Sequence, residues 1–401
     1  MTAIRIRRVP GAPVVAVRVW LPGGSTVEWQ PGQALLSGRL LLEGTQTRSW
    51  RRISDQAEER GIAITADAGY ETQGLSIDAL ADDWERALDW AAELVLGSVF
   101  PEERCRWLAQ QAAAQLEQLA DHPDVKTGWV FDKQLYGSGA RGRPLQGSAE
   151  SLESLDGAAC GSFHGSCLER GAIVTVAGDI SESAVDTKVR SLFGGLPNPR
   201  RDPQRPMDGG GETAARQEVE LEESEQAHWF GGAVTVSRRD PDYWALGLLG
   251  IVLGAGGNLS GRITHRVREL EGLAYSCGVS TVSGAGHDAG CFRVAVGTSP
   301  DRVAEVGVAV TEELEALVRE GVTQEELRDA RAYVLGRAPF ARETARQWAD
   351  LLAQAELFGV PIDDHNWVAE RWRAVTQDEM LEVARRHLDP RRLKVTVGLA
   401  G

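Results

Sequence analysis

The stretch RVRELEGLAYSCGVS, residues 266–280, brings together two side chains that can make strong polar contacts. Arg268 lies in the last turn of a helix predicted for GNLSGRITHRVREL, and Gly272 can end that helix by adopting φ > 0. Tyr275 follows at the start of a predicted strand. An arginine at a helix end and a tyrosine at a strand start can approach each other across the turn between them.

A purely structural interpretation of the same residues is also open. The strand period of LAYSCGVS places Leu273, Tyr275 and Cys277 on one face, so the tyrosine could be a half-buried packing residue. Arg268 could simply favour the negative C-terminal end of its helix. The charged neighbours are predicted to form a solvated face: Arg266, Glu269 and Glu271.

The usual catalytic motifs are absent from the sequence. H-E-x-x-H, H-x-x-E-H, G-x-S-x-G and a phosphate-binding loop do not occur, and no two of the 7 histidines stand three or four residues apart. The glycine-rich LGAGGNLSG at 253–261 lacks dinucleotide-binding spacing and is predicted to be a loop. The sequence therefore predicts neither a metal site nor a cofactor site in this chain.

The composition argues against a nucleic-acid-binding protein and against a membrane-spanning one. The chain has 401 residues, 42% of them hydrophobic, and a formal net charge of −15, which indicates a globular protein of two domains. Such an acidic chain is a poor binder of nucleic acid, and its apolar stretches are too short or too glycine-rich to cross a membrane. The 5 cysteines form no C-x-x-C pair, and no secretory signal is recognisable. We expect a cytoplasmic protein.

The sequence divides at residues 196–217, which are rich in proline and glycine and read as a linker. An N-terminal domain is predicted at 1–195 and a C-terminal domain at 218–401. The two halves look alike, because Pro101–Gly137 and Thr323–Gly359 both open with a Glu-Glu pair and close with an aromatic residue and a glycine. In both halves strands and an amphipathic helix come before this segment. The fold class predicted is α+β, with two copies of one domain.

These features resemble the M16 metallopeptidases, the pitrilysin and mitochondrial processing peptidase family. The resemblance covers nearly the whole chain and is most specific in RELEGLAY and in LLLEGTQTRSWRRISDQAEERG at 40–61. It implies two M16-type domains, each a mainly antiparallel sheet packed with long helices. In active members the second stretch directly follows H-x-x-E-H, and a later glutamate completes a zinc site.

The zinc-site positions implied by this resemblance hold Leu35, Gly38, Arg39 and Gln115. Leucine cannot ligate zinc, arginine repels it, glutamine offers only a weak neutral oxygen, and glycine has no side chain to activate water. The zinc site is predicted to be lost. Residues 35–42, LLSGRLLL, are instead predicted to form a helix whose leucines pack in the domain core.

The resemblance also gives the pair Arg268 and Tyr275 a role. In the family, the matching residues reach from the second domain to the zinc site. There a tyrosine hydroxyl can stabilise the oxyanion formed on a peptide carbonyl, and an arginine can hold a substrate carbonyl. Both residues are therefore expected to be catalytic in trans, in a chain that is inactive alone. The expected partner is a sister subunit that carries H-x-x-E-H and the zinc.

The substrates implied are peptides or unfolded segments, bound as an added β-strand. A homodimer in the absence of the sister is a further possibility. The alternative function is a purely structural or peptide-binding scaffold, such as the core subunits of the respiratory bc1 complex or a homodimer that captures peptides. The Arg268 and Tyr275 pair separates these hypotheses, because a scaffold has no reason to keep it.

Overall fold

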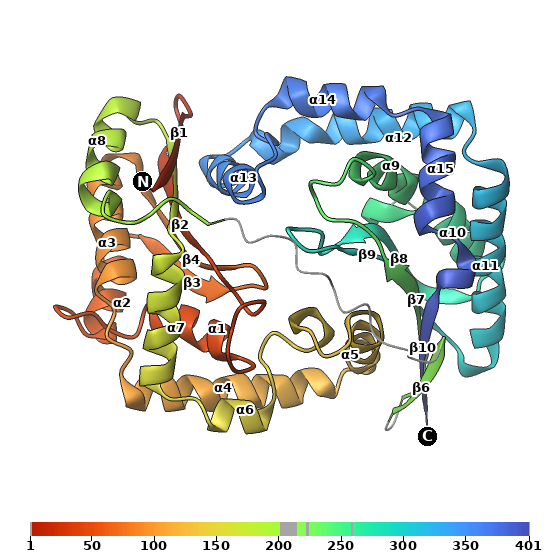
Figure 1. Cartoon of the computed structure of the whole chain (residues 1–401), viewed down its shortest axis with the longest axis horizontal. Coiled ribbons are helices and arrows are strands. Elements are labelled where there is room, and N and C mark those ends of the chain that lie inside the picture. The colour runs from red at the N-terminus through yellow and green to blue at the C-terminus, as the bar shows by residue number, and fades with distance from the viewer. Residues whose placement is uncertain (1, 201–214, 222–223, 258–259, 401) are drawn as a thin grey trace. The chain divides into compact units, whose positions relative to one another are not determined.

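A computed structural model describes residues 2–200, 215–221, 224–257 and 260–400. Within these residues the chain forms two compact α+β units, each with a five-stranded sheet packed with helices (Figure 1). The predicted fold class is confirmed.

The two units are not the two halves of the sequence. Unit 1 holds the described residues up to Glu117, the segment from Pro144 to Arg200, and Ala338–Asp364. Unit 2 holds Gln118–Arg143, the described residues from Ala215 to Arg337, and those from His365 onward. Of the predicted linker at 196–217, residues 201–214 lie outside the described residues, and Arg216 and Gln217 already belong to a strand.

The sheet of unit 1 has the strand order β1-β5-β2-β4-β3. Neighbours pair antiparallel except β1 and β5, which are parallel. Strands β2 and β5 are almost continuously apolar and buried, as expected for strands covered on both faces. The strands are β1 (Ala3–Arg8), β2 (Val14–Pro22), β3 (Ala63–Ala68), β4 (Thr72–Leu80) and β5 (Ile173–Gly178).

The sheet of unit 2 repeats this topology, with the order β6-β10-β7-β9-β8 and one parallel pair, β6 and β10. Strand β8 lies at one edge, at the position that β3 occupies in unit 1. The duplication predicted from the sequence is thus confirmed by the order and direction of the strands. The strands are β6 (Arg216–Leu221), β7 (Ala227–Val234), β8 (Ala274–Ser283), β9 (Cys291–Thr298) and β10 (Lys394–Ala400).

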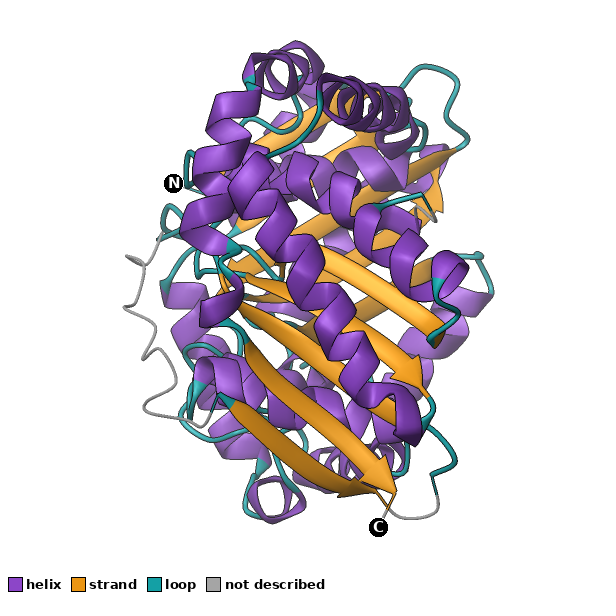
Figure 2. Cartoon of the chain, turned by 90° about the vertical axis from the view of Figure 1, so that its right-hand side faces the viewer, coloured by secondary structure: helices purple, strands orange, loops and turns teal. Residues whose placement is uncertain are grey.

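Helices cover both faces of each sheet. In unit 1, α3 and α8 pack on one face and α13 on the other (Figure 1). In unit 2, Figure 2 shows helices lying across the strands on the side that carries α11 and α15. The helices of unit 1 are α1 (Gln33–Leu40), α2 (Trp50–Glu58), α3 (Trp84–Leu96), α4 (Glu102–Ala120, whose last residues belong to unit 2), α6 (Ala149–Glu153), α7 (Gly157–Glu169), α8 (Glu182–Phe193) and α13 (Ala345–Phe358). Those of unit 2 are α5 (Pro123–Tyr136), α9 (Tyr243–Leu253), α10 (Arg262–Thr264), the π-helical turn η4 (His265–Leu270), α11 (Val303–Glu320), α12 (Gln324–Arg337), α14 (His365–Ala374) and α15 (Gln377–His387).

Each sheet receives one helix from the other half of the sequence. Helix α13 lies on β5 and β2 of unit 1, and α5 lies on β10 and β7 of unit 2. A buried threonine at the same place in each sheet holds the helix: the Thr175 hydroxyl donates to the Ala349 carbonyl at 2.8 Å, and Thr396 to the Gln134 Oε1 at 3.0 Å. These two helices are the ends of the repeated segments seen in the sequence. Each half of the sequence therefore contributes the last helix of its repeated segment to the sheet formed by the other half.

Candidate functional site

Helix α1 contains three of the four positions implied for the zinc site. Leu35 is 2% exposed, and Leu36 and Leu40 are fully buried, so the apolar side chains of this helix pack into the core of unit 1. The predicted helix and its leucine packing are confirmed. A leucine side chain has no atom that can ligate a metal.

Gly38 lies where α1 comes closest to strand β3. A Cβ atom built there would lie 2.6 Å from the carbonyl carbon of Asp67 and 2.9 Å from the amide nitrogen of Ala68. These are backbone atoms, which cannot rotate away as a flexible side chain could. Helix α1 and strand β3 pack too closely to leave room for a side chain at position 38, which the resemblance assigns to the catalytic glutamate. Any side chain there would force them apart.

The other two positions do not fit zinc either. Arg39 is directed to Asp67, with Nε 3.7 Å from Oδ1, so a permanent positive charge stands where a neutral ligand would be needed. Gln115 is exposed on α4. Among the described residues no group of three or more His, Cys, Asp or Glu side chains is placed to hold a metal ion. The side chains at these four positions cannot form the zinc centre of the family.

The family-like stretch after α1 keeps a well-bonded loop. Glu93 of α3 accepts hydrogen bonds from the hydroxyls of Thr45 and Thr47 at 2.7 Å and from the Arg48 guanidinium. Hydrogen bonding from Arg48 lowers the pKa of Glu93 to about 2, although burial opposes this shift. The loop is held to α3 by charge-assisted bonds, a structural role that survives without the zinc site.

A buried polar network lies beside the same helix. The amide of Gln73 joins the hydroxyl of Ser37, at 2.8 Å, to the His164 Nδ1, at 2.5 Å, and His164 Nε2 lies 2.7 Å from the Val95 carbonyl. Burial lowers the pKa of His164 and so favours the neutral imidazole, although the contact with the Val95 carbonyl opposes this shift. The network is enclosed in the core of unit 1 and satisfies polar groups there.

Arg268 and Tyr275 lie on either side of a short turn in unit 2. Arg268 is in η4, and Gly272, with φ 57°, follows the helix end as predicted. The last helical amides bond in wide turns, Glu271 N–H to the Arg266 carbonyl and Leu273 N–H to that of Val267. A π-helical turn of this kind is uncommon and is often found at functional sites.

The predicted facing of Leu273, Tyr275 and Cys277 is wrong, and a β-bulge is the reason. Ala274 pairs with Thr298 and Ser276 with its neighbour Gly297, which leaves Tyr275 as an extra residue in the ladder. A bulge turns side chains away from the regular alternation. Leu273 is therefore buried, whereas Tyr275 is 67% exposed.

Side chains from the neighbouring elements fix the backbone between the two residues. Arg302 donates from Nη1 to the carbonyls of Gly272 at 3.0 Å and Glu271 at 3.4 Å, and the Thr298 hydroxyl donates to the Leu273 carbonyl at 2.5 Å. Three successive carbonyls are thereby held. Sequence reasoning missed Arg302 and Thr298, because nothing in their local pattern points to residues 25 or more positions earlier in the chain.

Of the predicted solvated face, Glu269 and Glu271 are exposed, whereas Arg266 is only partly exposed and is held by ion pairs. Its guanidinium pairs with Glu271 at 2.7 Å, Glu312 at 2.6 Å and Glu313 at 3.3 Å, the last two on α11. These carboxylates raise the pKa of Arg266, and the largest contribution is the hydrogen bond that Arg266 Nε donates to Glu271. Arg266 ties the turn to α11. Arg268 is about half exposed, lies near Cys277 and has its Nε 3.9 Å from Oε1 of Glu269.

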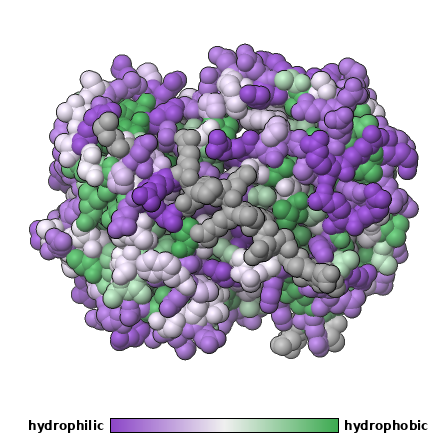
Figure 3. Space-filling view, viewed as in Figure 1, coloured by the Kyte–Doolittle hydropathy of each residue, from purple (hydrophilic) through white to green (hydrophobic). Residues whose placement is uncertain are grey.

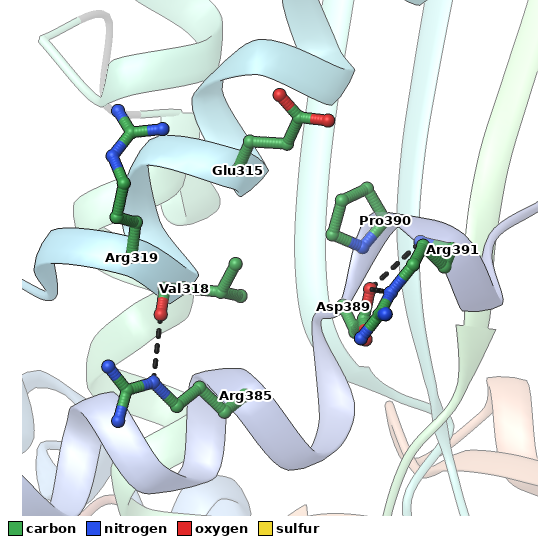
Figure 4. Close-up of a pocket in the computed structure, with 7 residues that line it drawn as sticks. All are labelled: Glu315, Val318, Arg319, Arg385, Asp389, Pro390 and Arg391. Carbon is green, nitrogen blue, oxygen red and sulfur yellow. Dashed lines mark hydrogen bonds and ion pairs between the residues drawn. The ribbon is translucent and has the colours of Figure 1, made fainter.

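A separate pocket of about 500 Å³ lies between the end of α11 and the end of α15 (Figure 4). Three of its charged groups are engaged with their surroundings: Arg391 pairs with Asp389, and the Arg385 Nε donates to the Val318 carbonyl at 2.9 Å. Neither Arg268 nor Tyr275 lines it. On the face shown in Figure 3, hydrophobic residues form small separate areas among hydrophilic ones.

The chain thus has two duplicated α+β domains. Helix α1 is packed against β3, and Arg268 and Tyr275 are exposed. This combination points to a protein built on a peptidase fold. Residues 4–146 match the family model described as insulinase (peptidase family M16), and residues 170–334 match that of the peptidase M16 inactive domain. The chain belongs to peptidase family M16.

Similar proteins agree with this assignment. An uncharacterized zinc protease of Streptomyces coelicolor is 29% identical over 86% of this chain and 76% of its own length. One of Mycobacterium tuberculosis is 29% identical over 97% and 89%. The fold is that of a peptidase M16 inactive domain from Pseudomonas fluorescens (TM-score 0.88, 21% identity, 100% and 96% covered) and of a Helicobacter pylori protease (TM-score 0.87, 17% identity, 99% and 97% covered).

No helix within the described part of the chain is both long enough and apolar enough to cross a bilayer.

Proposed function

We propose that this chain is the non-catalytic subunit of a two-chain M16 zinc peptidase that cleaves peptides or unfolded segments. Its partner is a sister subunit that carries H-x-x-E-H. Arg268 and Tyr275 of this chain complete the partner's site. The names of its relatives as zinc proteases support a peptidase context.

One contrast carries the proposal. Two of the zinc positions are closed by packing, Leu35 in the core and Gly38 against the backbone of β3, while Tyr275 is exposed on a bulge whose flanking backbone is held by Arg302 and Thr298. Large exposed side chains on a fixed backbone contribute little to stability but are well suited to meet a ligand.

The chemistry assigned to each residue follows from its donor groups. The Tyr275 hydroxyl donates a hydrogen bond to the oxyanion that develops when a peptide carbonyl is attacked, and a fixed donor needs no reorganisation at that moment. The Arg268 guanidinium holds a neighbouring carbonyl of the peptide through two parallel N–H groups. Neither role requires the zinc to be bound by the same chain.

Reconstitution tests the proposal. A sister subunit with H-x-x-E-H is sought among the genes beside this one, and the chain, the sister and the mixture of both are assayed with an unstructured peptide. Activity that appears only in the mixture supports the proposal. A stable complex with no more activity than the sister alone would make this chain a scaffold.

A further inference from the structure

Two of the five cysteines lie next to each other in the core of unit 1. Cys105 of α4 and Cys160 of α7 are both fully buried, and their Sγ atoms are 3.9 Å apart. A disulfide has an S–S distance of about 2.05 Å, so the sulfurs would have to approach by roughly 2 Å. Small rotations of two side chains can supply such a movement.

The surroundings of the pair restrict what it can become. The thiols lie in an apolar cluster with Leu36, Leu40 and Leu108, and the other polar contact of Cys105 is a weak one to the Leu155 carbonyl at 4.0 Å. A close-packed core has no room for an added group such as glutathione. A bond between the two sulfurs adds no atoms and is the one oxidation product that fits.

The position of the pair in the chain gives such a bond a structural effect. The loop that it would close contains Gln118–Arg143, the segment that leaves unit 1 and carries α5 into unit 2. Both ends of this excursion would then be joined inside unit 1. The Ser37 hydroxyl also donates to the Cys160 carbonyl at 2.9 Å, so α1 would be anchored to the same crosslink.

We propose that Cys105 and Cys160 are a site of oxidative modification, at which a thiol oxidant forms an intramolecular disulfide that joins α4 to α7. With diamide as the oxidant, the two S–H bonds break and one S–S bond forms. The N=N bond of diamide accepts the two electrons and two protons and becomes a hydrazine. Because both thiols are buried, the reaction proceeds through local opening of the core.

The full-length chain is treated with diamide, then unfolded, alkylated with iodoacetamide and analysed by mass spectrometry with and without prior reduction. Two fewer thiols should be alkylated than in the untreated chain, and a crosslinked peptide should join residues 105 and 160. The thermal midpoint should rise on the order of 5 °C and return after dithiothreitol. Cys105→Ala and, separately, Cys160→Ala should abolish the crosslink and the shift.

Cys167 is the matched control, since it is equally buried on α7 and contacts the Gly23 carbonyl instead of a second thiol. Cys167→Ala should leave the crosslink and the thermal shift unchanged. Alkylation of all five thiols after diamide treatment would overturn the proposal. So would a crosslink that pairs Cys167 or Cys291 while Cys105 and Cys160 stay reduced.

Discussion

Helix α1 of unit 1 and the η4–β8 turn of unit 2 occupy two places that the M16 resemblance connects with catalysis, and they differ in every physical respect. At α1, Leu35 is buried and Gly38 touches the backbone of β3. At the η4–β8 turn, Tyr275 is two-thirds exposed on a bulge. The first place has been converted into core, whereas the second still presents polar groups to a ligand.

This difference separates residues whose type is explained by packing in the core from residues whose type is not. A buried leucine stabilises the fold by about 1.5–3 kcal/mol, so the residues of α1 need no further reason. An exposed tyrosine on a bulge brings little of that stabilisation. The pairing of three carbonyls near it with Arg302 and Thr298 indicates that the geometry of this turn matters.

The largest effect is expected at position 38, which the M16 resemblance assigns to the catalytic glutamate. Gly38→Glu places a charged side chain against the Asp67 and Ala68 backbone, and should lower the free energy of unfolding by about 3–5 kcal/mol. Gly38→Ala should cost about 1–3 kcal/mol. Urea denaturation followed by circular dichroism measures both.

Gly165→Ala is the matched control for these variants. Gly165 is also inside a helix, α7, and a Cβ built there meets nothing within 4 Å. It should be neutral or stabilising by up to about 1 kcal/mol. Equal effects at positions 38 and 165 would show that α1 has not closed over the glutamate position.

Arg268→Ala tests the second of the two places, the η4–β8 turn. In the reconstituted pair it should raise KM about 10- to 100-fold, because one charge-assisted contact to the substrate is lost. The stability of the chain alone should change by less than about 0.5 kcal/mol. Steady-state kinetics test the first expectation, with Arg328→Ala as a control at an exposed arginine of α12. Equal KM values for the two variants would contradict the role of Arg268.

Arg302→Met should loosen the turn without touching a substrate. It removes the two hydrogen bonds to the Gly272 and Glu271 carbonyls, at a cost of about 0.5–1.5 kcal/mol. Hydrogen exchange of the amides at 271–276 should become several-fold faster in the chain alone. Arg319→Met, which removes only an exposed pair with Glu320, should leave this exchange unchanged. Unaltered protection in Arg302→Met would show that the turn is rigid for other reasons.

The smallest expected effect concerns the buried histidine of unit 1. Burial lowers the pKa of His164, so the folded chain takes up a proton at this imidazole at a lower pH than the unfolded chain, which does so near pH 6.5. The unfolded state then binds more protons, and stability falls as the pH drops from 7 to 5. Folded Glu93, with a pKa of about 2, stays ionised in this window, and its contribution to the pH dependence is lost mainly below pH 5.

Urea denaturation at several pH values should show a shallower dependence for His164→Gln than for the natural chain. The exposed His365→Gln should keep the natural slope. Parallel slopes in all three proteins would mean that His164 is not held neutral in the fold.

The fold was largely accessible from the sequence, because its information is periodic and repeated. The Glu-Glu and aromatic-glycine signals of the two halves mark equivalent helices, and the two sheets have the same strand order. The exchange of α5 and α13 between the two halves of the sequence could not be predicted. It depends on contacts such as Thr175 to Ala349, which join residues 174 positions apart.

The candidate site was accessible only in part. The loss of zinc ligands follows from residue types at Leu35 and Arg39, but the closing of the site does not, since it needs the distance between Gly38 and β3. The bulge at Tyr275 likewise escaped the alternation of LAYSCGVS, because a bulge depends on the partner strand β9. The sequence shows which residue types are present at the site, but the orientation of their side chains depends on contacts with distant segments of the chain.

The measurement that tests the central claim most directly is a titration of the sister subunit with this chain and with its Tyr275→Phe variant. Both should bind to the same stoichiometry, because the substitution removes one exposed hydroxyl. At saturation the natural chain should give full turnover, and Tyr275→Phe should lower kcat by roughly ten- to a thousand-fold with little change in KM. Equal kcat values at saturation would contradict the account and leave this chain as a scaffold.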